Sequence, residues 1–289
     1  MSVFAMKLLA VVSMLIDHSG VFLRQQFHIG DGLYTVMRTL GRLAFPLFCF
    51  LIVNGFEKSS DRKKYLTRLT VFAIVSQIPF SLVSKAANYT DMASAGLLFA
   101  RPTYLIVLSL LCVFVGWYGA VRSDLSALLP AAALLLGITR FSVNGIYWLY
   151  PGMNVFYTLA VSLALLCVLE RLSDPGALLS REGLCAVLGV CAALAMIQNS
   201  SDYGYAGIML VLMLWLARSS RRRQCAALLL WCIYQYLLAH TKPEYFFAAV
   251  LAVVPLLLYN GRLGRPVHIG FYILYPAHLL LLGMLIILI

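Results

Sequence analysis

Long apolar runs alternate with short polar, basic or Pro/Gly-rich stretches along the whole chain. Most runs approach the ~20 residues that a helix needs to cross the ~30 Å hydrocarbon layer of a bilayer. The in/out alternation typical of a transmembrane barrel is absent, so the pattern predicts helices. We expect eleven spans, or ten if residues 125–138 are re-entrant. The expected spans are residues 4–23, 40–56, 66–83, 103–121, 125–138, 155–169, 184–197, 205–217, 224–239, 245–259 and 269–289.

The composition agrees with this pattern. The 289 residues are 62% hydrophobic and 11% charged, whereas a globular domain is about half apolar and about a quarter charged. One soluble core cannot bury so much apolar surface, so lipid must solvate it. We predict an all-α, polytopic transmembrane helix bundle that forms a single domain over residues 1–289. The first apolar run carries Asp17 and His18 without a small-residue cleavage site, so it is not expected to be a signal peptide.

The formal net charge of +11 is distributed mainly over loops. The two richest basic clusters follow the second and eighth expected spans: Lys58, Arg62, Lys63, Lys64 and Arg68, then Arg218, Arg221, Arg222 and Arg223. By the positive-inside rule, these loops and the N-terminus are expected to face the cytoplasm. A basic tail or aromatic-rich platform for nucleic acid is missing. Seven cysteines lie within apolar runs and form no CxxC pair, which indicates buried small side chains rather than a metal site.

The first expected helix carries the most informative polar residues. Lys7 and His18 are eleven positions apart, almost three whole turns, so they share one helix face about 16 Å apart along the axis. This arrangement suits a long anionic ligand that enters from the cytoplasm with its reactive end at His18. Histidine is the natural general base near neutral pH. Asp17 points about 100° away and is expected to pair with a neighbouring helix; a purely structural buried pair is the alternative.

The second helix and the basic segment after it supply further candidates. Arg42 lies near the outer boundary and could neutralise Asp17, while Pro46 would kink the helix or mark its early turns. Asn54 lies near the inner boundary, where it could approach a ligand or simply pack between helices. Four basic side chains of the next segment could hold the phosphates of a nucleotide-bearing cofactor, or could be plain topology signals. They are Arg62, Lys63, Lys64 and Arg68.

Three candidates lie late in the chain. Asp202 is expected at the outer mouth, and Tyr275 and His278 near mid-membrane in the last helix, beside Pro276. A histidine is costly if it faces lipid, so His278 is expected to face a cavity or another helix. The sequence contains no HExxH motif, P-loop, GxSxG elbow or metal-binding spacing of carboxylates.

These segments together resemble the TraX family. The resemblance runs in order over nearly the whole chain, and it rests on the following motifs: KLLA at 7–10, MLIDH at 14–18, GRLAFPLF at 41–48, NGF at 54–56, RKKYL at 62–66, SQIPF at 76–80, NVFYTL at 154–159, DYG at 202–204 and YPAH at 275–278. The chain is also similar in motif to type-three integral membrane acyltransferases. These carry a basic residue, ten residues and a histidine on the first helix, as Lys7 and His18 do here.

The resemblance implies an inner-membrane acetyltransferase that uses acetyl-CoA, with the N-terminal amine of pilin as one possible acceptor and a cell-envelope glycan as another. On this view His18 is the base, assisted by Asp17. The donor is held by Lys7, Asn54, Arg62, Lys63, Lys64 and Arg68. The acceptor meets Arg42, Asp202, Tyr275 and His278, and no metal is needed.

Two other function classes remain open from the sequence. A bundle with intramembrane Asp, His and Arg also describes a proton-coupled transporter or permease. A structural partner in an envelope assembly would need none of Lys7, His18 or the basic segment.

Overall fold

The computed structural model describes seven segments of the chain: residues 1–88, 142–143, 146–147, 153–171, 203–237, 242–265 and 270–288. Three expected spans, residues 103–121, 125–138 and 184–197, lie outside the described residues, as does Asp202.

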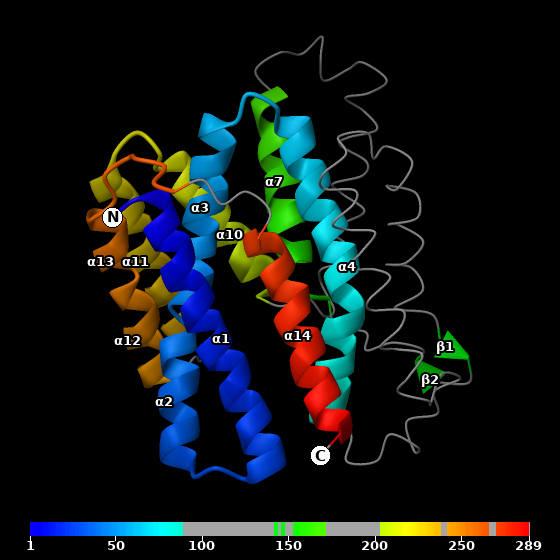
Figure 1. Ribbon diagram of the computed structural model, residues 1–289. Helices are drawn as coiled ribbons and strands as arrows, with labels where there is room; N and C mark the ends of the chain where they lie inside the picture. Colours follow the sequence, from blue (N-terminus) through cyan, green and yellow to red (C-terminus); the bar gives the residue numbers. More distant parts are fainter. Residues whose placement is uncertain are drawn as a thin grey trace.

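Within these segments the structure is all-α, as predicted, apart from one short strand pair (Figure 1). Strand β1 (Ser142–Val143) pairs antiparallel with β2 (Ile146–Tyr147). The described helices are α1 (Val3–Phe27), α2 (Asp31–Gly41), α3 (Ala44–Lys58), α4 (Arg62–Asn88), α7 (Val155–Arg171), α10 (Gly204–Leu216), α11 (Arg221–Leu237), α12 (Pro243–Leu251), α13 (Val253–Leu257) and α14 (Gly270–Leu288).

Two helical stretches are long and apolar enough to cross a bilayer, Val3–Phe27 and Asp31–Lys58. Shorter apolar helices follow at Val155–Glu170, Gly204–Leu216, Pro243–Leu257 and Gly270–Ile286. With the apolar composition, these helices indicate a membrane protein.

The second expected span is longer than predicted and is interrupted. Helix begins at Asp31 rather than near Leu40, and the break falls at Arg42, between α2 and α3. Pro46 explains the break, because its nitrogen cannot donate to the carbonyl four residues earlier, which is that of Arg42. On the other side of the break, the backbone N–H of Arg42 donates to the Thr39 carbonyl, and this tighter turn ends α2. Pro255 interrupts the tenth expected span in the same way, at the junction of α12 and α13.

Helix α3 forms the centre of the described structure. It packs against α1, α7 and α10, and most of its side chains are buried, including Phe45, Phe50 and Phe56. Helix α14 lies between α1 and α4 (Figure 1). The hydrophobic faces of these helices meet around α3, which leaves polar residues on only a few inward positions.

The connections between these helices lie at two opposite ends of the bundle. The start of α1 and the α3–α4 connection lie at one end of the bundle, and the α1–α2 connection lies at the other (Figure 1). The backbone N–H groups of Val3 and Phe4 donate to the carbonyls of Arg262 and Leu263, which ties the N-terminus to the same end. We call the end that carries Lys58, Arg62, Lys63 and Lys64 the basic end, and the opposite one the distal end.

Candidate functional site

A cavity of about 640 Å³ lies at the basic end, between α1, α3, α4, α7 and α14. Four cationic side chains line it, with one carboxylate, that of Asp61, among the described lining residues. The cations are Lys7, Lys58, Lys64 and Arg68. We call this space the basic cavity. It reaches the surface where Lys58 and Lys64 are exposed.

Some of these groups are already engaged. Lys58 Nζ donates to the Tyr259 hydroxyl at 2.8 Å and to the Gly261 carbonyl at 2.9 Å. The Tyr259 hydroxyl in turn donates to Asn54 Oδ1 at 3.0 Å. Asp61 Oδ1 accepts the backbone N–H of Lys64 at 2.8 Å and so caps α4. The lone carboxylate of the lining is therefore partly committed to its own helix.

The remaining cations are available to a ligand. Within the described residues, the ion pairs do not include Lys7, Lys64 or Arg68. Lys7 Nζ lies 5.7 Å from the centre of the Phe271 ring, and Arg68 Nε is buried without a hydrogen-bond partner among the described residues. Four cations against one carboxylate among the described lining residues leave the cavity with a net positive charge, which favours an anion.

The structure brings together four of the six residues predicted to hold the donor. Lys7, Asn54, Lys64 and Arg68 line the basic cavity; Arg62 and Lys63 do not. Arg62 pairs with Glu170 of α7 and lies over the Phe56 ring. Lys63 is exposed beside Lys64, one helix position and about 100° away from the lining face.

Lys58 is a lining residue that the sequence analysis did not select. It belongs to the basic cluster after the second expected span, but charge alone does not separate the members that face inward from those that face solvent. The C-terminal turns of α3 decide this, because they place Lys58 beside Asn54, one turn earlier.

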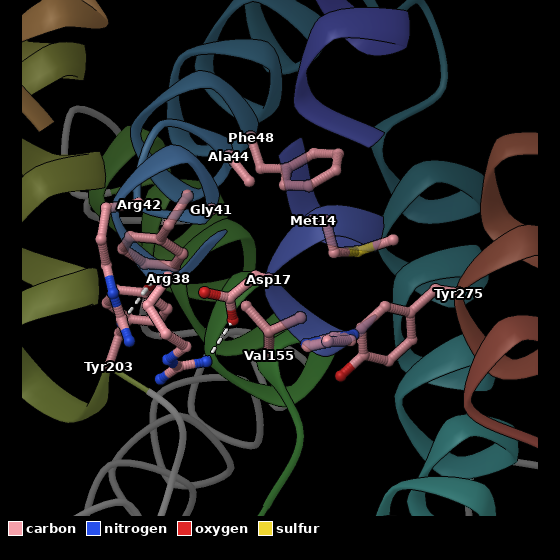
Figure 2. A pocket seen from close by; sticks show the side chains of 12 residues that line it. Met14, Asp17, Arg38, Gly41, Arg42, Ala44, Phe48, Val155, Tyr203 and Tyr275 are labelled. Atoms are coloured by element: carbon pink, nitrogen blue, oxygen red, sulfur yellow. Dashed lines mark hydrogen bonds and ion pairs between the residues drawn. The ribbon is translucent and has the colours of Figure 1, made fainter. Parts of the chain in front are cut away.

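A smaller cavity, of about 120 Å³, lies farther along α1 toward the distal end. Its polar lining includes Asp17, His18, Arg38, Arg42 and Tyr275. Figure 2 labels Asp17, Arg38, Arg42 and Tyr275 together with apolar side chains around them. We call it the imidazole cavity. Four of its polar lining residues were predicted site residues; Arg38 was not.

The two histidines predicted to matter are in contact. His18 Nδ1 lies 2.6 Å from His278 Nε2, and the ring planes are within 9° of parallel. His278 Nδ1 lies 2.9 Å from the Leu274 carbonyl. A carbonyl oxygen only accepts, so His278 Nδ1 carries its proton and, in the neutral ring, His278 Nε2 accepts from His18 Nδ1. Neutral His18 therefore has its lone pair on Nε2, as a base requires.

Asp17 forms its ion pair with Arg38 rather than with Arg42. Asp17 Oδ2 accepts from Arg38 Nη1 at 2.5 Å, and both side chains are mostly buried. Arg38 was not a predicted site residue, because it falls between the first two expected spans; in the structure it lies on α2, one turn before Arg42. Asp17 Oδ1 is buried without a hydrogen-bond partner in the described part of the chain.

Arg42 lines both the imidazole cavity and a third cavity of about 190 Å³. Its guanidinium donates to the Tyr203 hydroxyl at 3.3 Å and lies 4.8 Å from the centre of the Tyr245 ring. Tyr203 has a left-handed backbone (φ 62°) and stacks on Phe45 with ring centres 3.6 Å apart. Arg42 and Tyr203 line both spaces, and Trp231 and Tyr245 are among the aromatic residues of the third.

The helix face that was expected to hold one long ligand from Lys7 to His18 borders two cavities. Lys7 lines the basic cavity and His18 the imidazole cavity, although both lie on the same unbroken helix α1. Phe48 lines both cavities. An apolar side chain between two polar positions carries no signal in the pattern of polar residues, so this division was not expected.

Comparison with known proteins agrees with the motifs. The family model described as TraX protein matches residues 2–144 and 141–286, which is nearly the whole chain. The chain belongs to the TraX family. No solved structure matches it.

Two curated relatives share parts of the sequence. A probable fimbrial assembly protein, FimC of serogroup H1, from Dichelobacter nodosus is 34% identical over 109 residues, which cover 38% of this chain and 43% of the relative. An uncharacterized protein of Rickettsia prowazekii (strain Madrid E) is 35% identical over 87 residues, 30% of each chain. The matched stretches thus span less than half the length of these relatives.

Proposed function

We propose that this TraX-family chain is a multi-pass inner-membrane acetyltransferase that moves an acetyl group from cytoplasmic acetyl-CoA to an extracytoplasmic acceptor. The observation that carries the proposal is that the basic cavity lies next to the imidazole cavity along α1. At the second cavity His18 of α1 contacts His278 of α14. The first space can bind an anionic donor, and the second can activate an acceptor.

The cationic lining of the basic cavity and its distance from His18 along α1 both suit the proposed donor. Lys7, Lys64 and Arg68 face it without ion-pair partners among the described residues. Phosphate oxygens would provide the missing counter-charges through charge-assisted hydrogen bonds. Lys7 and His18 are about 16 Å apart along α1, so a donor held at its phosphates by Lys7 needs a long arm to present its thioester at His18.

The reaction then follows from the tautomer of His18. His18 Nε2 removes the proton of the acceptor amine or hydroxyl as that atom attacks the thioester carbonyl. The new bond joins the acceptor to the acetyl carbon, and the carbon–sulfur bond breaks. The proton passes from His18 to the leaving thiolate, so the products are acetylated acceptor and free CoA. His278 holds the His18 ring in place throughout, a positioning role instead of the acceptor contact expected from sequence.

The acceptor would approach from the side opposite the donor. Arg42 and Tyr203 lie between the imidazole cavity and the third cavity, whose walls carry aromatic rings. The relative with the printed name of a fimbrial assembly protein supports a pilin-type acceptor. An acetylated envelope glycan is the other acceptor class to test.

The direct test is acetyl transfer by purified protein in lipid nanodiscs, with labelled acetyl-CoA and isolated pilin or envelope glycan. We expect transfer by the native chain and a loss of roughly 10²–10⁴-fold in the His18→Ala variant. His28→Ala is the matched control, since His28 lies exposed at the end of the same helix. Full activity in the His18→Ala variant would exclude His18 as the base.

Donor binding tests the basic cavity separately. Lys64→Gln should weaken acetyl-CoA binding by about tenfold or more, because a hydrogen bond to a charged group contributes about 1.5–3 kcal/mol. Lys63→Gln should leave the affinity unchanged, since the adjacent Lys63 does not line the cavity. Equal losses in the two variants would mean that the charge acts only through the general surface potential. A proton-coupled transporter would show no specific acetyl-CoA affinity at all.

A further inference from the structure

The wall between the basic and imidazole cavities is apolar and is built from three helices. Phe48 of α3 lines both spaces. On α7, Val155 lines the imidazole cavity and the next residue, Phe156, lines the basic cavity. Met14 of α1 lines the imidazole cavity one turn before His18. Figure 2 shows Met14 and Phe48 on the side of the imidazole cavity away from Arg38.

The side chains of this wall are held in place by packing. Met14 and Tyr275 belong to a buried cluster against which Phe48, Val155 and Phe156 pack. The Phe156 ring meets the Tyr275 ring edge-on, with ring centres 5.0 Å apart.

A polar anchor at the start of α7 adds to this packing. Asn154 Oδ1 accepts the backbone N–H of Phe156 at 3.0 Å, and Asn154 Nδ2 donates to Gln77 of α4 at 2.8 Å. Because both Asn154 and Gln77 are buried, this anchor fixes where Phe156 enters the wall.

A donor that occupies both cavities has its phosphates on one side of Phe48 and its acyl group on the other. With its phosphates in the basic cavity and its carbonyl at His18, only the acyl group and the thioester lie beyond Phe48. The space there is about 120 Å³, against about 640 Å³ on the phosphate side. Its apolar walls include Ala44, Val155 and Met14, so a short apolar chain is compatible in chemistry but a long one has no room.

We propose that the imidazole cavity is an acyl-group subsite that restricts the donor to short acyl chains, with Phe48 as the main determinant of chain length. The proposal rests on the proposed acetyltransferase function. It assigns the selection of acyl-chain length to apolar side chains, because the charged residues and His18 contact parts that all acyl-CoA donors share. A close-packed wall rejects added methylene groups, because they can fit only by displacing buried neighbours.

Binding of acetyl-, butyryl- and hexanoyl-CoA to purified protein in nanodiscs tests this directly by calorimetry. We expect the native chain to bind acetyl-CoA at least tenfold more tightly than hexanoyl-CoA. In the Phe48→Ala variant this ratio should fall toward one. Leu51→Ala is the matched control, since Leu51 lies one turn away on α3 and lines only the basic cavity; its ratio should match that of the native chain.

The outcomes separate the two proposals. If the native chain binds acetyl-CoA but binds hexanoyl-CoA equally well, or if Phe48→Ala leaves the ratio unchanged, the acyl-size filter is wrong while the donor site stands. If the native chain binds none of the three thioesters, the donor site fails and the filter with it. Phe48→Leu removes less volume and keeps the site packed; it should give an intermediate ratio even if Phe48→Ala does not fold.

Discussion

At the scale of residues, one carbonyl oxygen sets the proton positions of the histidine pair. The Leu274 carbonyl fixes the proton on His278 Nδ1, and His278 Nε2 then fixes the proton of His18. The result is a lone pair on His18 Nε2, reached through a chain of two imidazoles rather than through a carboxylate. The carboxylate of Asp17 is engaged in the ion pair with Arg38.

The histidine chain predicts a specific pattern of rescue. His278→Ala should lower the transfer rate by roughly 100-fold, because His18 loses the partner that orients its ring. His278→Gln should recover most of that loss, since the amide oxygen can still accept from His18 Nδ1. The KM for acetyl-CoA should stay constant in both variants. Native rates in the His278→Ala variant would refute the positioning role, and inactivity of both variants would show that His278 itself must titrate.

Sequence reasoning identified most of these residues but not their partners. His18, His278, Asp17 and Arg42 stand out because ionisable groups in apolar runs are costly. Which of them touch depends on how α1, α2 and α14 pack, and the sequence does not report interhelical register. Arg42 was expected to neutralise Asp17, and its charge does act on this carboxylate, but the direct ion pair is with Arg38, one helical turn earlier.

At the scale of elements, the broken second helix shapes the site. Pro46 forces the break at Arg42, and Gly41 lets α2 approach α1 closely just before it. A Cβ atom added at Gly41 would lie 2.2 Å from the Cβ of Asp17, far inside contact distance. The break and the close approach together bring Arg38 and Arg42 to the face of α1 that carries Asp17.

Substitution of Gly41 tests this contact. Gly41→Ala should destabilise the fold by about 1–3 kcal/mol and lower activity, since α1 and α2 must separate. Gly32→Ala on the same helix meets no atom within 4 Å and should leave both stability and activity near native or slightly improve stability. Thermal unfolding in nanodiscs, followed by transfer assays, measures both effects. Equal melting temperatures for the two variants would show that the close approach is not needed.

Helix types and most helix positions follow from hydrophobic runs alone, as α1, α4, α7, α10, α11 and α14 show. The interruptions at Pro46 and Pro255 needed more than periodicity, because a proline can either kink a helix or start one. The amphipathic α2 was missed since its polar face resembles a loop in a search for apolar runs. The apolar wall at Phe48 was missed for the converse reason: a phenylalanine in an apolar run carries no signal of its own.

At the scale of the whole molecule, charge is polarised along the bundle. The basic end holds the N-terminus, the α3–α4 connection and the mouth of the basic cavity, and the distal end holds the α1–α2 connection (Figure 1). By the positive-inside rule we expect the basic end to face the cytoplasm, the side from which the proposed donor would enter. Donor and acceptor would therefore enter from opposite sides of the membrane.

Single cysteines in a background lacking the seven native ones test this orientation. Gly30→Cys, at the distal end, should react with a membrane-impermeant maleimide applied from the periplasmic side. Ser60→Cys, at the basic end, should react only after the inner membrane is opened. Both positions are exposed in the fold, so access depends on the membrane alone. The reverse labelling pattern would place the donor cavity outside the cell.

The most direct measurement of the central claim is an electron cryo-microscopy structure with a hydrolysis-resistant acetyl-CoA analogue. The two-cavity account predicts phosphates within hydrogen-bond distance of Lys7, Lys64 and Arg68, an arm passing Phe48, and the carbonyl beside His18 Nε2. An analogue bound elsewhere, or one whose reactive end stays on the Lys7 side of Phe48 remote from His18, would contradict it.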